Sequence, residues 1–167
     1  GLTSLGKELI KKCNNLNIVI DLSHLNAKGF WDVAKISNKP LVATHSNAHE
    51  ICPHSRNLTN KQLQAIKDSD GIVGLNLATA FLRTDGKMEE DTDLENILRH
   101  FDHLINFLGE DNVAIGSDFD GAKVPLKIKN LTGMNNLKEY LLNKGYSVDL
   151  IKKIFSENWL NFFYKYY

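Results

Sequence analysis

Two histidines, each at the end of a strand-like apolar run, are the residues best suited to chemistry. His24 closes the run that begins at Asn17, and His45 closes the run that begins at Pro40. In a parallel α/β enzyme, functional side chains gather at the carboxyl ends of the strands, where the loops converge. Neutral imidazole nitrogens are zinc ligands, so we expect His24 and His45 to share a metal ion. The alternative is a pair of ordinary histidines at strand ends.

A pair of carboxylates follows another apolar run. Asp118 and Asp120 come after the segment that begins at Asn112 and precede Gly121. At the end of a strand, Asp118 is suited to take a proton from water at the metal, or to hold the ammonium group of a substrate. The alternative is an Asp-Gly turn whose carboxylates are solvated.

Arg56 lies in the loop that follows the second apolar run, together with His49 and His54. The planar guanidinium suits a substrate carboxylate bound through two hydrogen bonds, whereas a lone loop arginine is otherwise a surface charge. We expect the two loop histidines to be supporting residues. Three further side chains after the third run are candidates for substrate contact: Asn76, Thr79 and Arg83.

These residues need a framework, and the chain alternates between helical and strand-like patterns. Apolar spacing predicts helices over 5–15, 26–36, 59–68, 93–108, 135–144 and 148–164, and strands over 17–22, 41–44, 71–77 and 112–117. The strands are continuous apolar runs, which is typical of a parallel sheet covered by helices. We therefore predict a single α/β domain, residues 1–167, with four parallel strands alternating with helices.

Four strands are too few to close a barrel of this type, which takes about eight. The outer edges of strands 17–22 and 112–117 would stay unpaired, and apolar edges invite pairing with another chain. The sequence therefore predicts half of a (β/α)8 barrel that associates with a complementary half or with a second copy of itself.

The composition excludes several classes of function. Twenty basic and 20 acidic residues give a net charge of zero, and they are mixed along the chain, which argues against a nucleic-acid partner. No apolar stretch approaches the length of a membrane span, so we expect no membrane partner. Only Cys13 and Cys52 are present; we interpret them as reduced thiols rather than a disulfide, which favours a cytoplasmic location.

Several segments resemble the membrane (renal) dipeptidase family, in that family's order and spacing. They are Gly1–Gly6 (GLTSLG), Ile20–His24 (IDLSH), Thr44–Ala48 (THSNA), Cys52–Leu58 (CPHSRNL) and Gly116–Gly121 (GSDFDG). The resemblance covers essentially the whole chain and implies part of a (β/α)8 barrel that holds two zinc ions and hydrolyses dipeptides. Within it, His24 and His45 resemble ligands of the second zinc, Arg56 the residue that binds the substrate carboxylate, and Asp118 the residue beside the reacting water and the substrate amine.

The resemblance also implies what these residues lack. The family's His-x-Asp pair, its metal-bridging glutamate and a further substrate-binding histidine precede the GLTSLG segment and have no counterpart here. The chain thus resembles the second half of the barrel, strands five to eight, and we expect it to bind zinc weakly and hydrolyse little without the N-terminal half. A catalytically silent half-barrel that serves as a binding or assembly module is the alternative. A third hypothesis is an amidohydrolase-like barrel with other substrates.

Overall fold

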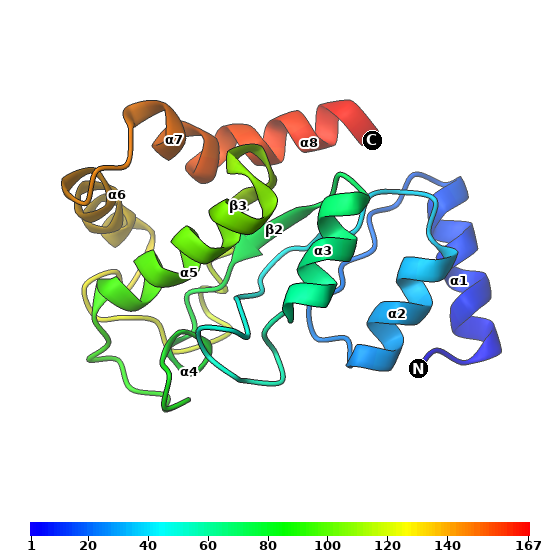
Figure 1. Ribbon diagram of the computed structural model, residues 1–167, viewed down its shortest axis with the longest axis horizontal. Coiled ribbons are helices and arrows are strands. Elements are labelled where there is room, and N and C mark those ends of the chain that lie inside the picture. The colour runs from blue at the N-terminus through cyan, green and yellow to red at the C-terminus, as the bar shows by residue number, and fades with distance from the viewer.

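The computed structural model describes residues 1–167 and contains a parallel sheet flanked by helices (Figure 1). The sheet has three strands in the order β1-β2-β3: β1 Val42–Ala43, β2 Ile72–Leu75 and β3 Val113–Ile115. Val42 pairs with Ile72, and Val73 pairs with Val113, in parallel register. The α/β architecture with a parallel sheet is therefore as predicted, although the number of strands is not.

The helices are α1 Ser4–Asn15, α2 Ala27–Ile36, α3 Asn60–Asp68, the short α4 Thr79–Leu82, α5 Leu94–Leu108, α6 Met134–Asn143, α7 Val148–Lys152 and α8 Asn158–Tyr166. The six predicted helices are present in order, but the last is divided into α7 and α8, and α4 is additional. Polar side chains cap the N-termini of two of these helices. Asn26 caps α2, and Thr59 and Gln62 form a capping box at α3. None of the helices combines the length with the apolar character that a membrane crossing requires.

The predicted strand 17–22 is wrong. This segment makes only an isolated parallel bridge between Asp21 and Val42, and Leu22 N–H donates to the Val42 carbonyl at 2.8 Å. It lies beside β1, and its pairing with β1 is limited to this bridge. Too few backbone hydrogen bonds form for a ladder, although the bridge still holds the end of the segment next to β1.

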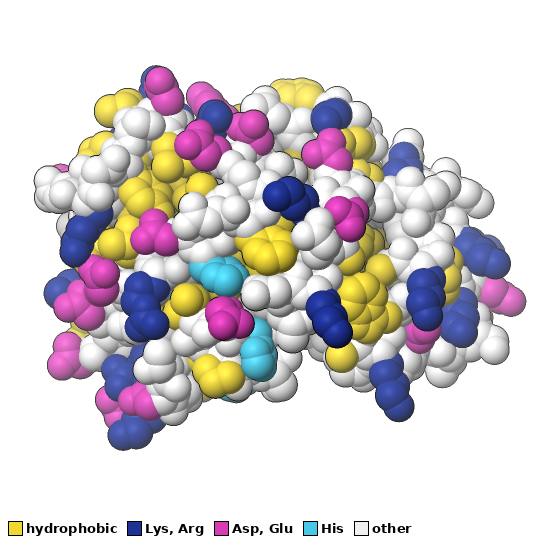
Figure 2. Space-filling view, viewed as in Figure 1, with side chains coloured by type: hydrophobic (Ala, Val, Ile, Leu, Met, Phe, Trp, Pro, Cys, Tyr) yellow, Lys and Arg dark blue, Asp and Glu magenta, His cyan; other side chains and the backbone are white.

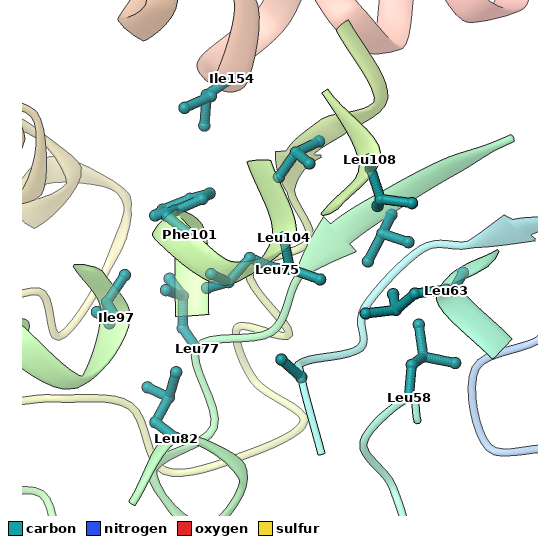
Figure 3. Close-up of a cluster of buried hydrophobic side chains, with 14 of the residues drawn as sticks. Leu58, Leu63, Leu75, Leu77, Leu82, Ile97, Phe101, Leu104, Leu108 and Ile154 are labelled. Atoms are coloured by element: carbon teal, nitrogen blue, oxygen red, sulfur yellow. The ribbon is translucent and has the colours of Figure 1, made fainter. Parts of the chain in front are cut away.

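One face of the sheet packs against α3 and α5 and forms the main core (Figure 3). Leu75 from β2 lies among side chains of these helices that are at most 4% exposed: Leu63, Ile97, Phe101, Leu104 and Leu108. Each fully buried side chain of this size contributes about 1.5–3 kcal/mol relative to an exposed one. This packing holds the strands rigidly and so fixes where their carboxyl ends lie.

The C-terminal helical segment packs partly against the other face of the sheet. There, Phe162 of α8 forms a small cluster with Val42, Ile72 and Ala114. The apolar spacing of residues 148–164 predicts that Phe163 packs inward, but Phe162 is 6% exposed and Phe163 is 43% exposed. A π-helical turn, η3 Lys153–Glu157, joins α7 to α8. Because it takes more residues per turn than an α-helix, it rotates the side chains that follow.

Two glycines allow the backbones of neighbouring strands to approach one another closely near the carboxyl ends of the sheet. A Cβ atom at Gly74 or at Gly116 would lie 2.0 Å from the carbonyl oxygen of Thr44. We expect Gly116→Ala to lower the free energy of unfolding by about 1–3 kcal/mol or more, because backbone has to move. Urea unfolding measures this. Gly6→Ala in α1, whose Cβ would have no neighbour closer than 3.5 Å, is the control and should stabilise by about 0.5–1 kcal/mol. An unchanged midpoint for Gly116→Ala would contradict the close approach.

Candidate functional site

The rings of His24 and His45 meet at the carboxyl end of the sheet. Their centroids lie 5.0 Å apart, with an angle of 58° between the ring planes. Two imidazoles bound to one tetrahedral zinc ion have centroids roughly 5 Å apart, because each nitrogen lies about 2.0–2.1 Å from the metal. The juxtaposition predicted from the strand pattern is therefore present, and its spacing suits a shared cation.

Unusual backbone conformations coincide with these residues. His24 has a φ of 71°, Asp118 a φ of 62° and Asp120 a φ of 65°, all in the left-handed region. For residues other than glycine this region is uncommon and costs of order 1–2 kcal/mol. Such conformations concentrate at functional sites, where the surrounding structure holds them. Here the left-handed conformations set the direction of the side chains that follow the first and the last apolar run.

Asn76 holds the Asp118 carboxylate beside the His45 segment. The Asn76 amide donates to Asp118 Oδ2 at 2.9 Å and to the His45 carbonyl oxygen at 3.4 Å, and its own oxygen accepts from Ala78 N–H at 2.7 Å. Asn76 is completely buried. The expectation that Asn76 contacts substrate is therefore wrong, because its amide is used to orient Asp118.

The other two candidates for substrate contact are placed differently, and the Thr79 hydroxyl is buried without a hydrogen-bond partner. Thr79 is fully buried in α4, and Arg83 forms two hydrogen bonds to the Asp85 carboxylate, at 2.8 and 2.6 Å. Neither side chain lines the hollow that contains His45 and Asp118. Sequence position after the third apolar run did not distinguish these residues from the ones at the site.

His45 and Asp118 open into one hollow of about 350 Å³, which is also lined by Thr44, Ile115, Gly116, Trp159 and Phe163. A larger hollow, of about 410 Å³, lies at the amino ends of β2 and β3 and includes the ion pair of Lys165 with Asp70. That larger hollow contains no histidine or cysteine. Of the four predicted site residues, His45 and Asp118 line the smaller hollow, and His24 and Arg56 do not.

The Arg56 side chain has hydrogen-bond donors that no other group in the chain satisfies. Its Nε and Nη2 atoms are buried without a hydrogen-bond partner, and its Cζ lies 5.3 Å from the centre of the Phe81 ring. Burial lowers the pKa of Arg56, and the carboxylates of Asp118 and Asp21 oppose that shift. Since unpaired buried donors on a cation are costly, this guanidinium is prepared for an anionic group that the chain itself does not supply.

The charged residues around the histidine pair influence the pKa of His24. Burial lowers the pKa of His24, and the positive charge of Arg56 lowers it further, whereas Asp118 opposes the shift. His54 supports Arg56 as expected: its Nδ1 accepts from Arg56 N–H at 3.1 Å, and its ring centroid lies 4.7 Å from that of Phe81. Arg56, His45 and Asp118 thus all act electrostatically on His24.

Asp21 and Thr44 complete the surroundings of His45, and the sequence did not single them out. The Thr44 hydroxyl donates to Asp21 Oδ2 at 2.5 Å and lies 2.7 Å from His45 Nδ1. Burial raises the pKa of Asp21, but the hydrogen bonds donated by Thr44 and Ser23 outweigh it and keep this pKa below its usual value. With Nδ1 engaged, Nε2 of His45 is the nitrogen left for a ligand.

The histidine pair can supply two ligands to a metal ion. Its ring spacing fits zinc, but no group of three or more His, Cys, Asp or Glu side chains in the chain is placed to hold a metal. Zinc usually takes four ligands. The residues present thus fit part of a zinc site and require further ligands from outside these residues.

His100 is a buried histidine outside this site. The amphipathic pattern predicts His100 and His103 on the polar or boundary side of α5, but His100 is completely buried and His103 is partly buried. Ala48 N–H donates to His100 Nδ1 at 3.1 Å, so Nε2 carries the proton and donates to the Leu82 carbonyl at 3.2 Å. Burial lowers the pKa of His100 to about 4.

This shift predicts a loss of stability in acid. The unfolded chain binds a proton at His100 below about pH 6.5, whereas the folded chain resists it down to about pH 4. The stabilisation is complete above about pH 6.5 and is lost as the pH falls to about 4, by of order 3 kcal/mol in all. Urea unfolding at pH 7 and pH 4.5 measures it. His100→Gln should flatten the dependence and His103→Gln should not; equal slopes in all three proteins would contradict the assignment.

A parallel sheet flanked by helices, with a histidine pair, a carboxylate and an arginine toward its carboxyl ends, is the α/β arrangement of TIM-barrel-like folds. Residues 1–165 match the family model of the membrane dipeptidases, peptidase family M19, and the chain belongs to that family.

Three relatives illustrate the similarity. A protein of Klebsiella pneumoniae encoded in the pqqA 5′ region is 51% identical over 160 residues, which are 96% of this chain and 59% of that protein. The dipeptidase aclJ of Aspergillus oryzae is 31% identical over 89% of this chain and 35% of its own length. A metallopeptidase of Rhodobacter sphaeroides, solved with a phosphinate mimic of L-Ala-D-Ala, is 51% identical with a TM-score of 0.98, over all of this chain and 48% of that one. The chain thus spans about half the length of its relatives.

Proposed function

We propose that this chain is the C-terminal half of a zinc-dependent dipeptidase barrel and supplies its second-half metal ligands and substrate-binding residues. The observation that carries the proposal is the half-buried Arg56 guanidinium, which has two buried nitrogens without partners and whose charge acts on His24 of the His24–His45 pair. A free carboxylate is the anion that a planar guanidinium binds best. A site that binds the terminal carboxylate of a peptide near the reacting groups favours very short peptides.

Each residue then has one role. His24 and His45 hold zinc, with His45 binding through Nε2. When bound, zinc supplies a Lewis acid that polarises the scissile carbonyl and lowers the pKa of water. Asp118 accepts the proton of the attacking water or holds the substrate ammonium group, and Arg56 binds the substrate's terminal carboxylate. Asn76 keeps the Asp118 carboxylate in place for either task.

The remaining ligands come from a partner in this proposal. The N-terminal half of the barrel is the partner that fits, because the chain matches about half of each related structure and its metal ligands are incomplete. Large apolar side chains are exposed near the sheet edge and on the last helix, among them Ile18, Leu160 and Phe163. Figure 2 shows hydrophobic side chains exposed between mixed acidic and basic ones on one face of the molecule. A homo-oligomer is the other assembly that would cover such surfaces. The cytoplasmic location of the protein stays a prediction.

Dipeptide hydrolysis by the protein that contains this chain together with an N-terminal half tests the proposal. L-Ala-D-Ala is the first substrate to assay, because the related metallopeptidase was solved with a mimic of it. Hydrolysis should be lost on treatment with a chelator and restored by zinc. A folded, zinc-loaded complex of both halves that leaves dipeptides intact would instead support the silent half-barrel, or, if it cleaved other amides, an amidohydrolase with different substrates.

A further inference from the structure

A hydrogen-bonded chain runs from Asp21 through Thr44 to His45. The distances are 2.5 Å between Thr44 Oγ1 and Asp21 Oδ2, and 2.7 Å between Thr44 Oγ1 and His45 Nδ1. Asp21 Oδ1 accepts two backbone hydrogen bonds, from Ser23 N–H and from Thr44 N–H, both at 2.9 Å. The Asp21 carboxylate therefore contacts the residue that precedes His24 and the residue that precedes His45.

The direction of these hydrogen bonds decides which histidine nitrogen carries the proton. A carboxylate only accepts, so the single hydroxyl proton of Thr44 is donated to Asp21. The Thr44 oxygen can then only accept from the ring, which places the His45 proton on Nδ1 and leaves the Nε2 lone pair free. The reverse direction would put the proton on Nε2 and block that nitrogen as a ligand.

The same residues also hold the two histidine segments together. Ser23 Oγ accepts from His45 N–H at 3.0 Å and lies 3.3 Å from Ser46 Oγ. These contacts and those of Asp21 join two segments that share only one isolated backbone bridge, Asp21 with Val42. The side chains thus replace the missing strand ladder at the point where ring spacing matters for a shared ion.

We propose that Asp21 and Thr44 are positioning residues that fix His45 in the Nδ1-protonated tautomer and hold it beside His24. The inference rests on the proposed function, in which His45 binds zinc through Nε2. Neither residue contacts the metal or the substrate. The partners that orient a metal-binding histidine typically change metal affinity about 10–100-fold.

Histidine-selective ¹⁵N NMR on the full protein, chelator-treated and held at pH 8, reads the tautomer without metal or substrate. We expect the Nδ1–H form for His45 in the wild type. In Asp21→Asn, the two backbone donors require the amide oxygen to stay at the Oδ1 position, so the amide nitrogen faces Thr44 Oγ1. The Thr44 hydroxyl should then donate to His45, and the proton should move to Nε2.

Variants of Thr44 provide the matched controls. Thr44→Val should give a mixture of tautomers, and Thr44→Ser should restore the Nδ1–H form. Thr92→Val removes another buried hydroxyl, one that bonds to the Glu89 carbonyl, and should leave the His45 signal unchanged. In a chelator competition, Zn²⁺ affinity should fall about 10–100-fold in Asp21→Asn and Thr44→Val, but not in Thr44→Ser.

The NMR and competition results separate this inference from the proposed function. A wild-type His45 protonated on Nε2, or an Asp21→Asn protein that keeps the Nδ1–H form, would overturn the positioning role even if the protein hydrolyses dipeptides. The expected tautomers in a protein that binds no zinc would leave the positioning geometry correct and refute the zinc function instead.

Discussion

Asp118→Asn in the complete enzyme is expected to lower kcat/KM for dipeptides by about 10³-fold, within the range of general acid–base residues. The asparagine oxygen can still accept from the Asn76 amide, which now bonds to Asp118 at 2.9 Å, so the geometry should survive while the charge and the basicity are lost. Steady-state kinetics with L-Ala-D-Ala measures the effect, and zinc content measured alongside shows whether the metal is retained.

Asp120 provides the matched control for Asp118. It lies two residues away, has a similar left-handed backbone with a φ of 65°, and is exposed. We expect Asp120→Asn to change kcat/KM by less than about threefold. A loss of under about tenfold in Asp118→Asn, or equal losses at the two positions, would argue against a catalytic role for Asp118.

Arg56→Met is expected to reduce kcat/KM for a dipeptide by about 10²–10³-fold, since a buried charge-assisted contact to a carboxylate contributes a few kcal/mol. The same substitution should hardly affect hydrolysis of the dipeptide amide, which has no carboxylate to bind. Arg56→Lys keeps the charge but loses the planar fork, so its effect should be intermediate. Kinetics on the paired substrates, acid and amide, measures the difference.

Replacing Arg56 should also have a characteristic effect on the stability of the fold. Its Nε and Nη2 are buried without partners, so removing the guanidinium leaves no group inside the chain that loses a hydrogen bond to them. We expect Arg56→Met to be at least as stable as the wild type in urea unfolding. Equal losses on the acid and amide substrates, together with a destabilised fold, would show that Arg56 is structural.

Much of the fold could be predicted because its signals are local. The Thr59–Gln62 capping box, the Asn26 cap and the Gly109 stop of α5 each depend on a few consecutive residues, and the structure contains all three. The strands alternate their side chains with a period of two. Positions relative to a strand end were therefore enough to bring His24 and His45 together.

The errors occur where distant segments decide the outcome. The segment 17–22 has strand-like residues, but its pairing with β1 stops at the single bridge of Asp21 with Val42, so no ladder forms. The π-helical turn rotates Phe162 inward in place of Phe163, against a pattern that assumes a uniform helix. His100 is polar by type, yet Ala48 and Leu82, which come from other parts of the chain, satisfy both of its nitrogens.

The sequence by itself determined the types of the reactive side chains, their places at the ends of apolar runs and the membership of the dipeptidase family. Only the tertiary structure decided the surroundings of those side chains: the contact of His45 Nδ1 with Thr44, the Asp118 carboxylate held by Asn76, and the unpaired nitrogens of Arg56. These properties depend on which groups from distant segments lie within hydrogen-bonding distance and on what excludes water. The spacing of residues along a chain does not specify either.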